Sequence, residues 1–493
     1  MPGGNRFVRS LRRNVMIEWG LFHQFFSTAF DLIYLALIVG TIIVIVLDNR
    51  DPVKTLAWVL VFIFIPLLGL IFYFFFGRKD RKERLISESG FARLTRYPME
   101  EFQAQKSFKY PWEQYHLMHF FRHLNKALPF ADNQIRIYTD GASMLLSLLH
   151  AIGEAKHHIH IEFFKFEDDP VGRLVRDALI DKAGEGVEVR VIYDDVGCWR
   201  VGRRFFEKML EGGVEVRGFL KVRFPLFTSK VNYRNHRKIA VIDGRVGFTG
   251  GMNLALRYVR GLDWGQWKDT QIQIEGKAVY GLQTVFLTDW YAMDRTLITS
   301  SRYFPEVSAT GKALIQIVTS DPIGEWRDIM QGLLLAITNA HTYFYLQSPY
   351  FLPPESIQTA LKTIALAGTD VRIMIPRKAD TILTHLASFS YLDDMMRAGV
   401  KIYFYEKGFL HSKLMVCDDQ LSTIGSTNMD FRSLEHNFEV NAFLYDRPSA
   451  LACKAIFLKD QESSTLLQPK QWALRPWYQK LGESVLRLIS PLL

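Results

Sequence analysis

His236-Arg-Lys238-Ile-Ala-Val-Ile-Asp243, followed after six residues by Gly250-Gly-Met-Asn253, occurs in two copies in this chain of 493 residues. The second copy reads His411-Ser-Lys413-Leu-Met-Val-Cys-Asp418 and is followed after six residues by Gly425-Ser-Thr-Asn428. Each of its positions lies 175 residues after the matching one, as His236 and His411 show. One copy alone would be a weak signal. Two copies at a constant offset indicate an internal duplication, which sets the fold and the site together.

Alternating and apolar segments predict the secondary structure around each copy. The apolar runs inside both copies predict short buried strands, on which His and Lys, two residues apart, point to one face. Further strands are expected at 159–164 and 187–193 in the first half and at 342–346 and 371–375 in the second. Strands that alternate with helices predict an α/β layered fold in each half, with the active site between the halves.

The repeated residue types suit phosphodiester chemistry. A neutral imidazole can attack phosphorus and form a phosphohistidine, lysine neutralises phosphate oxygens, and asparagine donates further hydrogen bonds to them. The alternative is that these are ordinary strand-end histidines and solvated lysines, and the paired copies argue against it. No metal-ligand pattern accompanies them. The candidate residues are His236, Lys238, Asp243 and Asn253, with His411, Lys413, Asp418 and Asn428.

From about Ile135 to Asp446 the chain resembles the phospholipase D superfamily, whose members carry paired HKD motifs. The resemblance implies that one histidine is the nucleophile and that the other protonates the leaving alkoxide. It implies a largely structural role for the motif aspartate and no metal or organic cofactor. It also implies that a carboxylate downstream of each motif orients a catalytic histidine. The matching residues are Asp269 and Glu439, so the two copies differ here.

Composition favours an anionic partner in a reducing compartment. The net charge of +9 and the pI of about 9.2 suit either nucleic acid or anionic lipid. The 37 phenylalanines are typical of a protein that contacts membranes. The three cysteines do not form a disulfide framework, so a reduced catalytic part is expected.

Two apolar segments near the N-terminus predict a hairpin of two transmembrane helices. Residues 56–76 carry no charge, and Asp31 is the only charge in residues 27–47, so each segment is long enough to span a bilayer. A polar turn at 48–55 separates them, and Pro66 is expected to kink the second helix. The alternatives are buried core helices or a cleaved signal peptide, and the latter fits poorly because two spans follow closely.

Basic residues flank both apolar segments on their outer sides. They place both termini and the catalytic part in the cytoplasm and the turn outside, in a multi-pass protein of the cell membrane. These residues are Arg6, Arg9, Arg12, Arg13, Arg78, Lys79, Arg81, Lys82 and Arg84. The stretch from Asp51 to Arg78 resembles the N-terminal membrane element of bacterial cardiolipin synthases, which selects one branch of the superfamily.

The expected division of the chain follows from these segments. A basic N-terminal segment (1–26) and the two transmembrane helices (27–77) precede a connector (78–134). The first phospholipase D-like half (135–305) and the second (306–465) follow. The C-terminal amphipathic segment (466–493) mixes Trp, Arg and Leu, which suits either a membrane-surface helix or packing on the domain.

The resemblance implies phosphatidyl transfer between two phosphatidylglycerols, which yields cardiolipin and glycerol through a phosphohistidine. His236 would be the nucleophile and His411 the acid and then the base. The alternatives are a hydrolytic phospholipase D using water, a phosphodiesterase acting on nucleic acid, and a non-catalytic lipid-binding scaffold. The membrane segments argue against nucleic acid, and two intact motifs argue against a scaffold. Which histidine attacks, whether the acceptor is phosphatidylglycerol or phosphatidylethanolamine, and the oligomeric state stay open.

Overall fold

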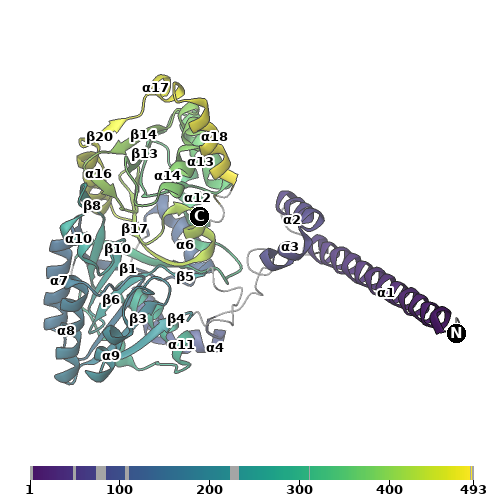
Figure 1. Cartoon of the computed structure of the whole chain (residues 1–493). Coiled ribbons are helices and arrows are strands. Elements are labelled where there is room, and N and C mark those ends of the chain that lie inside the picture. The colour runs from purple at the N-terminus through teal and green to yellow at the C-terminus, as the bar shows by residue number, and fades with distance from the viewer. Residues whose placement is uncertain are drawn as a thin grey trace. The chain divides into compact units, whose positions relative to one another are not determined.

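The computed structural model describes residues 4–47, 52–73, 85–105, 110–221, 233–309, 311–488 and 490 (Figure 1). The chain forms two compact units. The smaller comprises residues 1–80 with 228–232, and the larger comprises 81–227 and 233–493. Each unit is described by itself.

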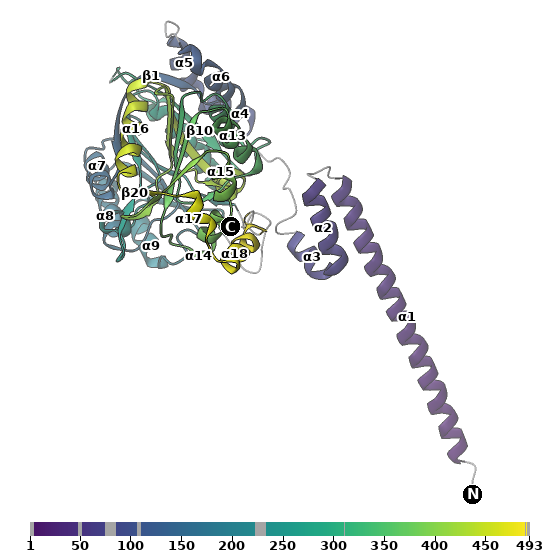
Figure 2. The same ribbon diagram turned by 90° about the horizontal axis from the view of Figure 1, so that it is seen from above.

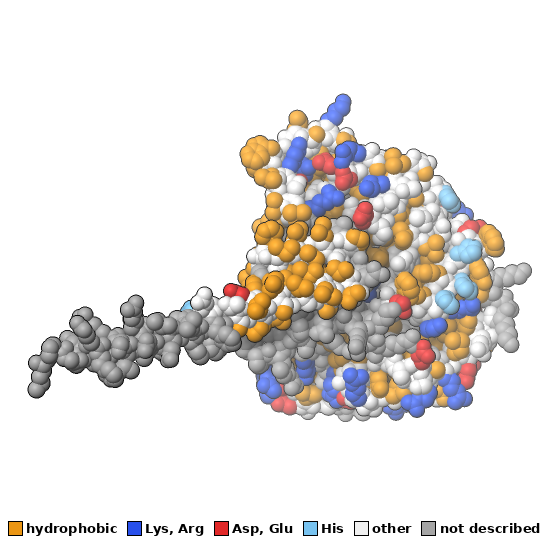
Figure 3. Space-filling view, turned by 90° about the vertical axis from the view of Figure 1, so that its right-hand side faces the viewer, with side chains coloured by type: hydrophobic (Ala, Val, Ile, Leu, Met, Phe, Trp, Pro, Cys, Tyr) orange, Lys and Arg blue, Asp and Glu red, His pale blue; other side chains and the backbone are white. Residues whose placement is uncertain are grey.

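The smaller unit contains α1 (Gly4–Leu47), α2 (Pro52–Phe64) and α3 (Pro66–Phe72). Within α1 the 21 residues Ser27–Leu47 have a mean hydropathy of 2.7 and are long enough to cross a membrane. Figure 3 shows hydrophobic side chains gathered over this part of α1 and its neighbours. The second apolar segment is interrupted, because α2 ends before Pro66 and α3 starts at it. The described residues thus show one helix of spanning length. Of the turn expected at 48–55, residues 52–55 begin α2, and residues 48–51 and the segment end at 74–77 lie outside the described residues.

The larger unit is built on one continuous sheet in which the strand order of the first half is repeated in the second. The first half contributes, in spatial order, β1 (Pro129–Tyr138), β9 (Gln271–Glu275), β7 (Val246–Gly250), β6 (Lys238–Ile242), β2 (His158–Phe163), β3 (Glu188–Asp194) and β4 (Glu215–Phe219). The second half contributes β10 (Ala313–Ser320), β19 (Asn437–Leu444), β17 (Leu421–Gly425), β16 (Leu414–Cys417), β11 (Tyr343–Gln347), β13 (Asp370–Pro376), β14 (Lys401–Tyr405) and an added β20 (Ser464–Leu466). The antiparallel pair β1–β10 joins the halves, and the predicted duplication is confirmed.

The duplication extends to strand register. Ile239 on β6 lies opposite Thr249 on β7, and Leu414 on β16 lies opposite Ile424 on β17. Both residues of the second pair stand 175 positions after those of the first. Each motif therefore occupies the same place in its half-sheet, on a strand buried along its whole length as the sequence predicted.

Helices flank the sheet and tie the two halves together (Figure 2). Three buried clusters form the core, and one of them joins side chains from both halves, including Trp290 and Phe457. The halves thus share a core. The first-half helices are α7 (Gly141–Gly153), α8 (Pro170–Gly184), α9 (Arg203–Glu211), α10 (Leu256–Arg260) and α11 (Val279–Asp294). The second-half helices are α12 (Asp328–Thr338), α13 (Glu355–Leu366), α14 (Ile382–Phe389), α15 (Leu392–Arg397), α16 (Arg447–Gln461), α17 (Pro469–Ala473) and α18 (Trp477–Leu488).

The segment expected to be a connector contains packed helices. It forms α4 (Glu88–Leu94), α5 (Arg96–Ala104), the short 3-10 helix Trp112–Gln114 and α6 (Tyr115–Leu124). Phe121 on α6 is fully buried and its ring centroid lies 4.6 Å from that of Phe443 on β19. β1 begins at Pro129, six residues before the expected start of the first half. The physical reason is that α6 covers an apolar surface of the second half that the duplicated elements leave open.

Candidate active site

Two short parallel strand pairs between the halves position the motif histidines. β5 (Arg234–Asn235), just before His236, pairs with the start of β19 from the other half. β15 (Gly408–Leu410), just before His411, pairs with β8 (Gln266–Lys268). The backbone N–H of His236 then donates to the carbonyl of Phe438 at 2.9 Å, and that of His411 donates to the carbonyl of Lys268 at 2.6 Å. Each histidine is thereby fixed against a strand of the opposite half.

The carboxylates downstream of the motifs contact these histidines across the two halves. Nδ1 of His236 lies 3.0 and 3.1 Å from the carboxylate oxygens of Glu439, which follows the second motif. Nδ1 of His411 lies 2.6 Å from Oδ2 of Asp269, which follows the first. Both carboxylates are fully buried. A carboxylate that accepts the Nδ1 proton leaves Nε2 with its lone pair for a substrate. The sequence named both carboxylates but did not indicate that the pairing crosses.

The motif lysines are buried beside the imidazoles. Nζ of Lys238 donates to the carbonyl of His236 at 2.6 Å. Nζ of Lys413 donates to the carbonyl of His411 and lies 3.9 Å from Oδ2 of Asp269. Neither side chain is more than a few per cent exposed. Nζ of Lys413 also lies 2.8 Å from Nδ1 of His411, so in the second copy His and Lys lie on one side as predicted.

Burial controls the charges in this site. It lowers the pKa of the His236 imidazole to about 4, although Glu439 opposes the shift. It lowers the pKa of His411 well below its usual value, helped by Lys413, Lys238 and His236. A positive charge on His236 is thus one of the causes that lower the pKa of His411. With no anion bound, both imidazoles are neutral near pH 7.

The four remaining charged groups balance one another. Burial lowers the pKa of Lys413 to about 8 and also lowers the pKa of Lys238. Burial raises the pKa of Asp269 to about 6 against the attraction of Lys413. Burial would also raise the pKa of Glu439, but His236 and Lys238 attract its charged form and together bring that pKa below its usual value. A phosphodiester anion would therefore enter a site whose own charges nearly cancel and would favour protonation of an imidazole.

The motif aspartates lie at the other ends of their strands and do not contact the histidines. Asp243 accepts hydrogen bonds of 2.8–2.9 Å from the backbone N–H groups of residues 156–158. Asp418 accepts equivalent bonds from residues 341–343. Both have positive φ, 53° and 51°, a conformation that Asp tolerates better than most residues. Each therefore ties its motif strand to the turn before the neighbouring strand.

The motif asparagines are both buried but differ in their partners. Nδ2 of Asn253 donates to the hydroxyl of Tyr258 at 2.6 Å, and its Oδ1 accepts from the backbone N–H of Lys165 at 3.1 Å. Oδ1 of Asn428 has no hydrogen-bond partner among the residues that the structure describes. The amide of the first copy is thus held by the protein, while that of the second keeps an unused acceptor.

Residues that the sequence did not single out complete the surroundings of the two pairs. Ser426 donates to Glu439, whereas its counterpart Gly251 leaves no room, because a Cβ there would lie 2.1 Å from Oδ1 of Asp269. The signal was present in the motifs, which read Gly-Gly in one copy and Gly-Ser in the other. Aromatic rings contact both histidines. The ring centroid of Phe164 lies 5.0 Å from that of His236, and the ring centroid of Trp267 lies 5.2 Å from that of His411.

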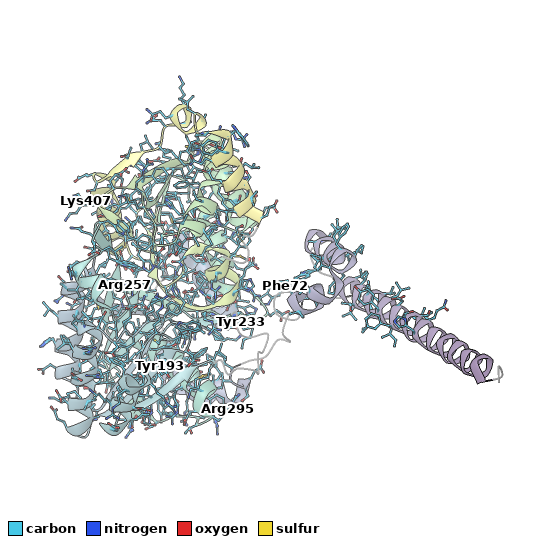
Figure 4. All side chains as sticks on the ribbon, in the orientation of Figure 1. Phe72, Tyr193, Tyr233, Arg257, Arg295 and Lys407 are labelled. Atoms are coloured by element: carbon cyan, nitrogen blue, oxygen red, sulfur yellow. The ribbon has the colours of Figure 1, made fainter. Side chains whose placement is uncertain are left out.

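Lys165 brings a further cation to the site. It follows β2 directly, its side chain is partly exposed, and its Nζ lies 5.9 Å from the ring centroid of Phe164. Behind burial and the motif groups, its charge is among the causes that lower the pKa of Lys238 and of His411. Arg257, labelled in Figure 4, is by contrast paired with Glu167. Burial and Arg257 lower the pKa of Lys165, and the charges of Glu167 and Asp380 oppose this shift. No sequence signal separates this lysine from other lysines.

Comparison with known proteins agrees with this geometry. Residues 148–290 and 333–461, which fall in the two halves, match the family described as cardiolipin synthase, PLD-like domain. Residues 36–78 match the phospholipase D-nuclease N-terminal family. Among the described residues, no group of three or more His, Cys, Asp or Glu could hold a metal ion.

Similar proteins cover nearly the whole chain. A cardiolipin synthase of Geobacillus sp. (strain WCH70) is 40% identical over 459 residues, which cover 91% of each chain. The major cardiolipin synthase ClsA of Bacillus subtilis (strain 168) is 37% identical over 480 residues, covering 95% of this chain and 99% of that one. A solved phosphatidylserine synthase of Haemophilus influenzae Rd KW20 has a TM-score of 0.58 at 15% identity, covers 77% of this chain and 100% of that one, and shares the fold. With its duplicated sheet and its paired motifs, the chain belongs to the PLD-like cardiolipin synthase family.

Proposed function

We propose that this protein is a membrane-bound cardiolipin synthase that transfers a phosphatidyl group from one phosphatidylglycerol to another and releases glycerol. The observation that carries the proposal is the pair of buried histidine–carboxylate contacts, His236–Glu439 and His411–Asp269, between two motif lysines. Relatives named cardiolipin synthases, 37–40% identical over most of the chain, support it. No residue of the site needs a metal or an organic cofactor for this chemistry.

The first step forms a covalent intermediate. Nε2 of His236 attacks the donor phosphorus, so a P–N bond forms while the P–O bond to glycerol breaks. Glu439 stabilises the positive charge that develops on the imidazole, and Lys238 and Lys413 stabilise the phosphorane oxygens. His411 protonates the departing glycerol oxygen. The buried site strengthens each of these interactions relative to water.

The second step reverses the first with a new alcohol. His411, now neutral, takes the proton from the hydroxyl of the acceptor phosphatidylglycerol, whose oxygen attacks the phosphohistidine. The P–O bond of cardiolipin forms, the P–N bond breaks, and His236 returns to its neutral form. Use of one group first as acid and then as base follows microscopic reversibility.

The second candidate is hydrolysis, in which water replaces the acceptor and the product is phosphatidic acid. Both reactions share the phosphohistidine, so the product decides between them. Purified full-length protein in vesicles of labelled phosphatidylglycerol should form labelled cardiolipin and one glycerol per cardiolipin. Phosphatidic acid as the only labelled product would contradict the proposal.

Lys165 supports transfer over hydrolysis, because a lipid acceptor brings a second phosphate and water does not. We propose that the ammonium of the partly exposed Lys165 binds the acceptor's phosphate. Lys165→Ala should lower cardiolipin formation by about tenfold, the scale of one charge-assisted hydrogen bond, and should raise the share of phosphatidic acid. Lys165→Arg is the matched control and should keep the wild-type product ratio. An unchanged ratio in Lys165→Ala would assign the acceptor site elsewhere.

We expect deprotonation of Lys413 to lower the activity at alkaline pH. Because its pKa is lowered to about 8 by burial, the charged form is complete at pH 6 and is lost as the pH rises through 8. We expect kcat/KM, which reports the free enzyme, to fall with a midpoint near pH 8. A Lys413→Arg variant that retains measurable activity should lose this limb, since a guanidinium stays charged. A wild-type kcat/KM that is constant up to pH 10 would show that Lys413 does not carry the effect.

The basic residues that flank the apolar segments support a multi-pass topology in the cell membrane with a cytoplasmic catalytic unit. The three native cysteines are buried, so a single introduced thiol can be labelled selectively. We expect a membrane-impermeant thiol reagent to label Asn49→Cys from outside intact cells and to leave Arg81→Cys unlabelled. The reverse pattern would place the catalytic unit outside the cell, and labelling of neither would argue against a hairpin.

A further inference from the structure

Helix α18 (Trp477–Leu488) presents its apolar face outward. Trp477 is 75% exposed, Leu481 55% and Leu488 80%, and with Val485 they recur at the three- and four-residue spacing of one helix face. A helix on the surface of a water-soluble domain normally turns such a face toward the core. α18 has the opposite orientation.

Polar side chains occupy most of the inward face of α18, where Leu486 also packs against the core. Glu483 is 2% exposed and accepts from Arg475 at 2.9 Å and from Gln479 at 3.0 Å. Arg487 donates to the carbonyl of Ser390 at 3.3 Å, and its guanidinium lies 4.5 Å from the ring centroid of Tyr391. The contacts of Glu483 with Arg475 and of Arg487 with Ser390 and Tyr391 fix the rotation of the helix, because turning the apolar face inward would break them.

The preceding segment holds α18 firmly on the domain. Trp472 on α17 is buried, and its ring centroid lies 5.2 Å from that of Phe389 on α14 and 5.9 Å from that of Phe404. The guanidinium of Arg475 lies 3.5 Å from the centroid of the same Trp472 ring. The exposed side chains of α18 are therefore presented by a packed element and not by a loose tail.

The charged residues beside the apolar face of α18 indicate which kind of surface it contacts. Between Leu466 and Leu488 the sequence has a single acidic residue, Glu483, which points inward. Lys470 and Lys480 remain at least partly exposed beside the apolar residues, whereas Arg487 lies 3.5 Å from Asp394 on α15. Figure 3 shows hydrophobic and basic side chains, with a few acidic ones among them, at the upper end of the view. An apolar stripe bordered by cations complements an anionic lipid surface, in which rings and aliphatic chains enter the headgroup region and cations meet phosphates.

We propose that α18 is an interfacial helix that inserts Trp477, Leu481, Val485 and Leu488 into the anionic leaflet facing the catalytic unit. It gives the larger unit a membrane contact of its own, separate from the N-terminal apolar helix. A soluble domain that exposed this stripe to water would carry an aggregation-prone patch, and lipid removes that liability. The inference does not depend on which acceptor the enzyme uses.

The environment of a label on the stripe tests the proposal without any use of activity. Full-length Leu481→Cys carrying an environment-sensitive fluorophore is reconstituted in vesicles of phosphatidylglycerol and phosphatidylethanolamine, and the buried native thiols stay unlabelled. We expect a blue-shifted emission that is quenched by lipids with brominated acyl chains. Leu146→Cys on α7, whose side chain is 70% exposed, is the control and should emit as in water.

Two results would overturn the proposal. Emission from Leu481→Cys that matches Leu146→Cys and resists the brominated lipids would place the stripe in water. A blue shift that depends on protein density and disappears when the protein is diluted in lipid would assign the stripe to a second copy of the chain. Since neither readout involves turnover, failure here is distinguishable from failure of the proposed function.

Activity provides an independent measurement. Full-length protein with Trp477→Ser, Leu481→Ser and Leu488→Ser should act on detergent-dispersed phosphatidylglycerol within about twofold of wild type. On vesicles its rate should fall by about fivefold or more, because the cleft is no longer held at the lipid surface. Leu146→Ser is the matched control and should behave as wild type on both substrates. Equal vesicle rates for the triple variant and wild type would exclude a role of the stripe in catalysis at membranes.

Discussion

Replacing His236 or His411 with alanine should each lower cardiolipin formation by at least about 10⁴-fold, the loss seen when a nucleophile or its acid–base partner is removed. The two histidines act in sequence on one phosphorus, so neither can substitute for the other. The two losses should not add, because a double variant removes the same pathway. His123→Ala on α6, an exposed histidine, is the control and should keep full activity.

Trapping the intermediate distinguishes the two roles. With labelled phosphatidylglycerol, His411→Ala should retain labelled phosphatidyl group on His236, since attack remains possible while acid and base assistance is lost. His236→Ala should retain none. Label on His236→Ala and none on His411→Ala would exchange the roles of the two residues, and full activity of either variant would exclude the two-histidine mechanism.

The second large effect concerns the crossed carboxylates. Glu439→Gln and Asp269→Asn should each reduce turnover by about 10²- to 10⁴-fold, because an amide no longer holds the imidazole as the right tautomer or stabilises its charge. The pairing predicts which step each change affects. Glu439 contacts His236 and Asp269 contacts His411, so the first variant should slow attack and the second should slow proton transfer.

The His411→Ala background separates these effects. In that background, Glu439→Gln should slow the appearance of labelled enzyme, whereas Asp269→Asn should have little further effect because its histidine is already absent. The opposite pattern would mean that each carboxylate serves the motif nearest to it in sequence. Thermal unfolding of each variant provides the control for a folding defect, since both carboxylates are buried.

Local patterns allowed the motif strands to be predicted well. The apolar runs after Lys238 and Lys413 form β6 and β16, and the four further strands predicted from 159, 187, 342 and 371 onward are all present within a residue of their expected starts. These are short-range signals, because they depend on the burial of adjacent residues. The duplication supplied the equivalence of the halves and therefore the shared site.

Contacts between residues far apart in the sequence could not be predicted from local patterns. The contact from His236 to Glu439 spans 203 residues and depends on the parallel pairing of β5 with β19, which no periodicity records. The outward orientation of the apolar face of α18 depends on the contact between Glu483 and Arg475. Composition alone did not predict this contact. The kink expected at Pro66 is a local feature and appears as a one-residue interruption at Ile65 between α2 and α3, crossed by the hydrogen bonds from Ile65 N–H to Val61 and from Gly69 N–H to Ile65.

The crossed pairing of histidines and carboxylates bears on how this site evolved. One half alone would present a histidine without its carboxylate and a carboxylate without its histidine, but two identical halves face to face would satisfy both. A gene for a single half could thus have encoded a working, symmetric pair before it was doubled. Once both halves lay in one reading frame, each could accumulate its own substitutions. The differences between Asp269 and Glu439 and between Gly251 and Ser426 are such substitutions. After such a fusion, one histidine can specialise as the nucleophile and the other as the acid and base.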